Sequence, residues 1–205
     1  MTTRPPPRQE LSRRERRKLE TRHRLVEAAM TLFRERGYEG TRVEDITERV
    51  DVAVGTFFNY FPAKEAVLAD FHREWNERAI RHAGRVTART TLNRFREQFL
   101  WSVRDITAED ARLHRILVAE LLTKPALLVD NRDVMERLFR IYDGWIEAGK
   151  RRGDVRVDVD PRTASLMLQE MFFFNVIRWG GDSTLDLEGR VTARLDLLFK
   201  GLGTA

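Results

Sequence analysis

The sequence predicts an all-α protein, because apolar residues recur at helical spacing and helix-capping signals stand where those patterns begin. Two segments, Ser12-Arg13-Arg14-Glu15 and Thr41-Arg42-Val43-Glu44, have the Ser/Thr-x-x-Glu form of a capping box. A third, Asp160-Pro161, places a capping residue before a proline at the first helical position. We therefore expect an N-terminal three-helix domain with a helix-turn-helix, followed by a larger helical domain.

Composition indicates an anionic partner and a reducing compartment. The 205 residues carry a net charge of +5, and residues 1–24 hold nine Lys or Arg against three Glu, so the positive excess is N-terminal. Without cysteine, disulfide frameworks and thiolate metal sites are excluded. No apolar run approaches the roughly 18 residues of a membrane span. We expect a cytoplasmic protein that does not enter a membrane.

The N-terminal segment is predicted to be a basic arm over residues 1–18, disordered or extending the first helix. Pro5-Pro6-Pro7 and the lack of an apolar pattern make residues 1–9 disordered or extended. The arm either follows DNA phosphates or is a solvated tail. The first helix should end at Gly37 after burying the residues that recur on one face, which are Leu19, Val26, Ala29, Met30 and Phe33.

The stretch from Thr41 to Leu68 reads as a helix-turn-helix. The first helix of this pair, which is the second helix of the chain, should begin just after Thr41 and bury Val43, Ile46 and Val50. Asp51-Val52-Ala53 is short enough for a tight turn, and the second helix ends before Pro62, whose ring disfavours α geometry in the preceding residue. In a helix-turn-helix of this kind the second helix lies in a DNA major groove.

The same residues resemble the DNA-binding domain of the TetR (tetracycline-repressor-like) transcription regulators. The resemblance runs from Arg24 through Leu68 and rests on Leu25-Val26-Glu27-Ala28-Ala29, Leu32-Phe33, Gly37-Tyr38, Thr41, Ile46, Val52, Gly55-Thr56, Tyr60-Phe61 and Lys64-Glu65. It implies a helix-turn-helix domain over residues 19–66 and a helical regulatory, ligand-binding and dimerisation domain over residues 67–205. It also implies double-stranded DNA, a homodimer and a small-molecule effector as partners.

By resemblance, the phosphate-contacting positions are Thr41, Tyr60 and Lys64, whereas Val54, Gly55, Thr56, Phe58 and Asn59 form the exposed start and face of the recognition helix. Arg42 completes the predicted DNA-binding set. Four residues depart from the family pattern. Phe58 stands where tyrosine is usual, Asp51 stands where glycine is common, and Ala53 and Ala63 stand where serine is common. The turn and the recognition helix therefore lack their usual permissive and capping residues.

Beyond Pro62, six further apolar patterns predict helices. Helix four runs towards Gly84, and the next two carry stripes from Leu92 to Ile106 and from Leu113 to Leu121, the latter broken by Pro125. A stripe from Val134 to Ala148 stops at Gly149 to Gly153. The helix from Thr163 to Trp179 is apolar nearly all round, so it must be covered on more than one side. By resemblance, it and the final helix form the dimer interface.

A small-molecule site in the second domain follows from the resemblance, and its candidate lining is apolar and aromatic with polar residues set among apolar runs. These candidates are Phe95, Phe99, Leu117, Glu120, Leu121, Met135, Phe139, Tyr142, Met171, Phe174 and Asn175, with Gln169 a further polar clue. The four histidines show no metal-ligand spacing, and no catalytic motif appears, so we expect neither metal, cofactor nor enzymatic activity.

The sequence thus predicts a DNA-binding regulator, a repressor released from a pseudo-palindromic operator by a small, largely apolar or aromatic effector. Two alternatives stay open. One is an effector-independent regulator controlled by a partner protein, and the other is a helical ligand-binding protein without specific DNA readout.

Overall fold

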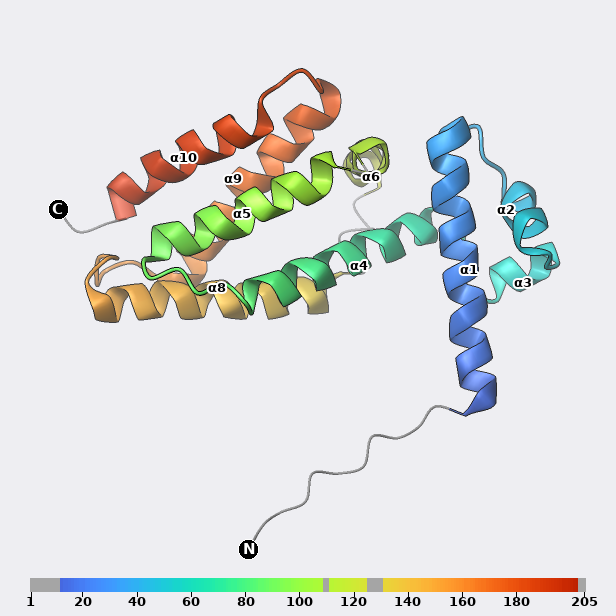
Figure 1. The fold of residues 1–205 in the computed structure, drawn as a ribbon, viewed down its shortest axis with the longest axis horizontal. Coiled ribbons are helices and arrows are strands. Elements are labelled where there is room, and N and C mark those ends of the chain that lie inside the picture. The colour runs from blue at the N-terminus through green and yellow to red at the C-terminus, as the bar shows by residue number, and fades with distance from the viewer. Residues whose placement is uncertain (1–11, 109–110, 125–130, 203–205) are drawn as a thin grey trace, which may run out of the picture. The chain divides into compact units, whose positions relative to one another are not determined.

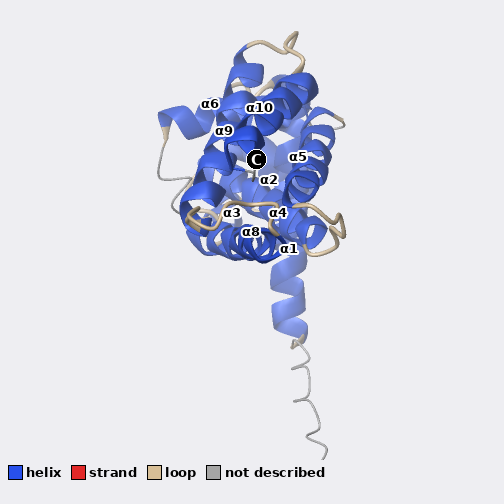
Figure 2. Ribbon diagram, turned by 90° about the vertical axis from the view of Figure 1, so that its left-hand side faces the viewer, coloured by secondary structure: helices blue, strands red, loops and turns tan. Residues whose placement is uncertain are grey.

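The computed structural model describes residues 12–108, 111–124 and 131–202, in which all regular structure is helical (Figure 2). The all-α prediction is confirmed. The chain divides into two compact units, residues 1–67 and 68–205, which we call the first and second units. The predictions for residues 1–9 and for a break at Pro125 fall outside the described residues.

The first unit is built on α1 (Arg13–Arg36), with α2 (Val43–Val50) and α3 (Val54–Phe58) along one side of it (Figure 1). The capping box at the start of α1 is confirmed. The Glu15 N–H donates to Ser12 Oγ over 3.2 Å, and the Ser12 N–H donates to Glu15 Oε2 over 2.8 Å. Hydrogen bonds to the Glu15 carboxylate from the Ser12 side chain and from the Ser12 N–H lower the pKa of Glu15.

The buried face of α1 differs from the predicted one. Leu19 is 53% exposed and Val26 is half-buried, whereas Leu25, Ala28 and Leu32 are buried beside the correctly predicted Ala29, Met30 and Phe33. The reason is the shortness of α2 and α3, which have 8 and 5 residues and cover little more than the C-terminal part of the 24-residue α1. Leu19 lies beyond their reach.

The second unit is a helical bundle (Figure 1). Its helices are α4 (Glu65–Ala83), which starts in the first unit, α5 (Thr91–Thr107), α6 (Ala111–Thr123), α8 (Arg132–Arg152), α9 (Pro161–Gly181) and α10 (Leu187–Leu202). Helix α9 packs against α6, α8 and α10, and α10 also packs against α5. Being covered by three neighbours is what the nearly all-round apolar character of α9 requires.

Gly149 and Gly153, which the sequence analysis treated together as one helix stop, have different roles in the structure. Helix α8 ends within the predicted stop from Gly149 to Gly153, because it continues to Arg152 and Gly153 ends it in a left-handed conformation with φ of 83°. Gly149 is instead a close approach, because a Cβ there would collide with Thr91 Oγ1 of α5. The start of α9 is as predicted, with Asp160 accepting from the Thr163 N–H over 2.8 Å and Pro161 at the first position.

An aromatic cluster fills the core of the second unit. The rings of Phe99 and Phe172 stack with centroids 4.8 Å apart, and Phe95 meets the Tyr142 ring edge-on at 5.1 Å. Burial raises the pKa of the Tyr142 phenol far above its ordinary value, which Gln98 only partly offsets by a hydrogen bond. These rings fix the spacing of α5, α8 and α9.

Candidate functional site

The turn between α2 and α3 is made by three residues. Asp51 ends α2 in a left-handed conformation with φ of 57° and ψ of 56°, and the Val52 N–H donates back to the Thr47 carbonyl over 3.1 Å. Ala53 then precedes α3 and provides no side-chain cap, and the Thr56 N–H donates to the Ala53 carbonyl over 2.8 Å. This tight reversal produces the expected helix-turn-helix.

Helix α3 has one anchored face and one free face. Phe57 and Phe61 are 0% and 1% exposed and hold the helix against the rest of the first unit. Val54 and Phe58 are 37% and 51% exposed. The structure therefore brings together the predicted base-reading residues, since the exposed set Val54, Gly55, Phe58 and Asn59 is contiguous with the half-buried Thr56 and Tyr60.

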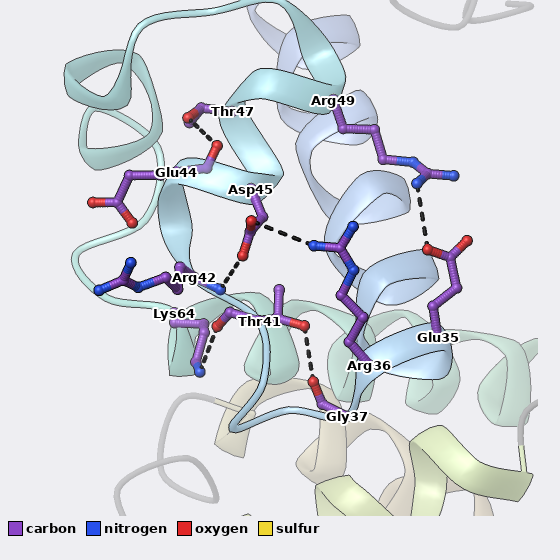
Figure 3. A network of polar contacts seen from close by, with 10 residues as sticks. All are labelled: Glu35, Arg36, Gly37, Thr41, Arg42, Glu44, Asp45, Thr47, Arg49 and Lys64. Carbon is purple, nitrogen blue, oxygen red and sulfur yellow. Dashed lines mark hydrogen bonds and ion pairs between the residues drawn. The ribbon is translucent and has the colours of Figure 1, made fainter.

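Thr41 and Lys64 instead support the turn before α2 (Figure 3). Lys64 Nζ donates to the carbonyls of Tyr38 and Thr41 over 2.7 and 2.9 Å and lies 4.1 Å from the centre of the Tyr38 ring. Thr41 is buried, and its hydroxyl donates to the Gly37 carbonyl over 2.8 Å. Its hydroxyl is therefore turned inward and bonded within the first unit.

The cap of α2 is shifted by one residue from the predicted one. Arg42 is the N-cap, and its N–H donates to Asp45 Oδ2 over 2.8 Å, so Asp45 rather than Glu44 closes the box. Arg42 is exposed and reaches away from α1 in Figure 3, and Val43 is half-buried where full burial was expected. Burying the Thr41 hydroxyl against Gly37 is what moves the cap on to Arg42.

Ion pairs and one cation fasten α1 to the helix-turn-helix. Arg36 and Arg49 pair with Asp45 and Glu35 at 3.4 and 3.5 Å (Figure 3). Arg24 donates to the Val50 carbonyl over 2.7 Å, where a cation also favours the negative end of the α2 dipole. The basic residues at the start of α1, from Arg13 to Lys18, are by contrast exposed.

The second unit contains a cavity of about 350 Å³. Its walls come from α4, α5, α6, α8 and α9, and most of them are apolar. The lining residues are His72, Trp75, Asn76, Ile106, His114, Leu117, Val118, Leu121, Met135, Phe139, Gln169, Glu170, Phe172, Phe173 and Val176. A largely apolar cavity with a few polar groups is typical of a small-molecule site.

Two histidines lie in the cavity wall. His114 meets the rings of Phe71 and Trp75 edge-on, with centroids 5.2 and 5.9 Å away. Burial, with a smaller effect from His114, lowers the pKa of His72 from 6.5 to about 4. Asn131 Nδ2 lies 3.3 Å from His72 Nδ1, and because an amide nitrogen only donates, Nδ1 accepts and the proton of this neutral ring sits on Nε2.

The predicted ligand residues divide into two groups. Leu117, Leu121, Met135 and Phe139 line the cavity, as does the polar clue Gln169. The other seven lie outside it, because their helical positions face elsewhere. Phe95, Phe99 and Tyr142 build the aromatic core, and Met171 packs against that core. Asn175 donates to the Met171 carbonyl, Glu120 pairs with Lys124, and Phe174 is exposed.

Sequence reasoning missed the contribution of α4, whose residues His72, Trp75 and Asn76 line the cavity. The signal was present, since they stand at i, i+3 and i+4 and therefore share one face of the helix. Two polar residues beside a tryptophan on an otherwise apolar face indicate a site better than the aromatic residues of the core do. No helix of the described part is long and apolar enough to cross a membrane, and the same part holds no group of three potential metal ligands.

Comparison with known proteins supports both units. Residues 25–71 match the family model of bacterial regulatory proteins of the tetR family. The transcriptional regulator TcmR of Streptomyces glaucescens is 32% identical over 160 residues, covering 73% of this chain and 68% of its own. The repressor KstR2 of Rhodococcus jostii is 26% identical over 189 residues, 89% of this chain and 90% of its own.

Among solved structures, Thermus thermophilus FadR, a TetR-family repressor in complex with lauroyl-CoA, matches with a TM-score of 0.69. It is 28% identical, and the match covers 90% of this chain and 96% of that one. The likeness therefore extends through the second unit as well as the first. With a helix-turn-helix whose second helix is free on one face, and relatives matching along most of its length, the chain belongs to the TetR family of DNA-binding bacterial transcription regulators.

Proposed function

We propose that the protein is a homodimeric repressor that binds a pseudo-palindromic operator and leaves it when a small, largely apolar effector fills the cavity. The observation that carries the proposal is the free face of α3, where Val54, Phe58 and Asn59 are exposed while Phe57 and Phe61 are buried. A helix anchored on one face and exposed on the other is suited to enter a major groove. The site of action is the double-stranded DNA of the cytoplasm.

The exposed side chains offer suitable contacts for readout. The Asn59 amide can pair bidentately with adenine, and Phe58 or the Thr56 methyl can meet a thymine methyl. Arg42 and the Tyr60 hydroxyl offer contacts to phosphate oxygens, which position the protein without reading sequence. In this scheme Lys64 and Thr41 act on DNA indirectly, by fixing the turn before α2.

A homodimer through α9 and α10 is supported by the apolar residues these helices leave exposed. Leu166, Met167, Phe174 and Leu197 are 38%, 46%, 61% and 69% exposed. Met167 and Phe174 stand seven residues apart and so share a face of α9. A two-fold dimer covering this face presents two recognition helices to half-sites about one DNA turn, or roughly 34 Å, apart.

An effector in the cavity is supported by the apolar lining and by the lauroyl-CoA bound to Thermus thermophilus FadR, which makes a long-chain acyl compound one candidate. The expected mechanism is a population shift. The effector favours a helix arrangement in which α4, which begins in the first unit and lines the cavity, moves the two recognition helices out of register with successive major grooves.

The test is selection of bound duplexes from a random pool at near-physiological salt, because phosphate affinity depends strongly on salt. We expect enrichment of a pseudo-palindrome, and Asn59→Ala should relax the preference at one position of each half-site. Arg81→Gln, an exposed change on α4 away from the recognition element, is the matched control. Failure of a folded dimer to enrich any sequence would contradict the proposal.

A further inference from the structure

One face of α4 contributes three hydrogen-bonding side chains to the wall of the cavity. His72, Trp75 and Asn76 are 8%, 8% and 1% exposed and all line the cavity. Other lining residues, such as Leu117, Leu121 and Phe172, are apolar and come from α6 and α9. A ligand in the cavity therefore meets hydrogen-bonding groups on α4, further polar groups at His114 of α6 and at Gln169 and Glu170 of α9, and apolar side chains over the rest of the wall.

Two of these groups are buried hydrogen-bond donors that lack an acceptor within the described part of the chain. The Trp75 indole nitrogen and the Asn76 amide nitrogen are buried, and neither has a hydrogen-bond partner among the described residues. Burying an N–H without an acceptor costs free energy, so buried donors are nearly always satisfied. The indole N–H can only donate. What completes this pair is consequently an acceptor.

The described cavity wall offers no lysine or arginine to compensate a negative charge on that acceptor. None of the lining residues in the described ranges is Lys or Arg, and Glu170 at its exposed edge is itself acidic. His72 is neutral at physiological pH, because burial holds its pKa at about 4. A carboxylate buried here would lose its hydration with no lysine or arginine to replace it.

We propose that the effector carries an uncharged carbonyl group, as in a ketone, ester or thioester, whose oxygen accepts hydrogen bonds from Trp75 and Asn76 while its hydrocarbon part lies against the apolar wall. The inference rests on the proposed function, since it specifies the effector of that regulator. It makes α4 the helix that senses the ligand. The same helix leads directly from the helix-turn-helix, because it begins at Glu65.

Three probes of similar size separate the possibilities: methyl octyl ketone, the matching alkene in which =CH₂ replaces the carbonyl oxygen, and decanoate. Affinities for the purified full-length protein are measured by displacement of a bound apolar fluorescent dye, without DNA. We expect the ketone to bind at least about 10-fold more tightly than the alkene, the loss that an unmade buried hydrogen bond implies. Decanoate should bind more weakly than the ketone at neutral pH.

Variants test whether the two donors cause that preference. Trp75→Phe keeps an aromatic ring and removes the N–H, and Asn76→Leu keeps the volume and removes the amide. Each variant should lower the ratio of ketone affinity to alkene affinity several-fold. The alkene affinity should stay nearly unchanged, and this result would also show that the cavity is intact. Trp101→Phe is the matched control, because Trp101 stacks on His82 and does not line the cavity.

Equal affinities for ketone and alkene, tightest binding of decanoate, or an unchanged ratio in both variants would overturn the inference. Release of operator DNA is measured separately, by fluorescence anisotropy of a labelled duplex. Selective ketone binding without DNA release would support the carbonyl site and contradict the repressor mechanism. DNA release by ketone and alkene alike would support the mechanism and overturn the carbonyl site.

Discussion

Asp51 holds a backbone conformation that glycine adopts more easily. Its φ of 57° lies in the left-handed region, where a Cβ is unfavourable. We expect Asp51→Gly to raise the free energy of unfolding by up to about 1 kcal/mol. The gain is smaller than the steric cost of a Cβ in the left-handed conformation, because glycine also gains freedom in the unfolded chain. Urea denaturation measures the change. Asp51→Ala removes the charge but keeps Cβ, so it should not stabilise; equal stabilisation by both variants would assign the effect to charge.

His72 should make stability depend on pH. Its pKa is lowered from 6.5 to about 4 in the fold, so the unfolded chain binds the proton more readily. The neutral ring therefore contributes full stability above pH 6.5, and that contribution is lost as pH falls towards 4, by about 3 kcal/mol at about 1.4 kcal/mol per pKa unit. In His72→Gln this part of the acid destabilisation should vanish. Parallel pH profiles for the two proteins, from urea denaturation, would show that His72 is not the group responsible.

The start of α1 carries exposed basic residues on a regular helix rather than on a loose tail. We expect the combined change Arg13→Gln, Arg14→Gln and Arg17→Gln to weaken binding to all duplexes and to flatten the slope of the salt dependence by about 0.9 for each phosphate that is no longer neutralised. Titration of a labelled operator at several salt concentrations measures both. The matched control changes Arg81, Arg85 and Arg89, also exposed, to Gln. An equal weakening in the control would mean that net charge, not the α1 arm, is responsible.

At the level of elements, local sequence signals were sufficient to predict where the helices begin and end but not which face of each helix is buried. Caps and breakers such as Ser12, Asp160 and Gly153 act within one or two turns, so they can be recognised in the sequence. The face that is buried depends on how far the neighbours extend, which is why Leu19 was misplaced.

The site shows the same limit. The exposed face of α3 was predictable because the turn and the two buried phenylalanines fix its rotation. The inward roles of Lys64 and Thr41 were not, since their partners are backbone carbonyls set by the path of the chain before α2. In the cavity, aromatic residues were misleading because packing of the core and binding of a ligand call for the same side chains. The polar face of α4 distinguishes the two.

For the whole molecule, the exposed apolar face of α9 predicts that oligomeric state and operator affinity change together. Phe174→Glu places a charge at a residue that is 61% exposed in the single chain and buried in the proposed dimer. We expect a monomer by analytical ultracentrifugation and at least about 10-fold weaker operator binding, because the two half-sites are no longer bound cooperatively. Val157→Glu, at a position 80% exposed, is the control. A Phe174→Glu protein that remains dimeric would place the interface elsewhere.

The double hydrogen bond of Lys64 has a consequence for covalent labelling. The chain has five lysines against 32 arginines, so amine-selective reagents can modify few side chains. With two N–H groups held by carbonyls and a ring beside it, the Lys64 amine is sheltered, whereas Lys18 and Lys200 are exposed. Acylation should reach Lys64 last, as peptide mass spectrometry can record. Its labelling rate then reports whether the DNA-reading unit is folded, in the absence of any DNA.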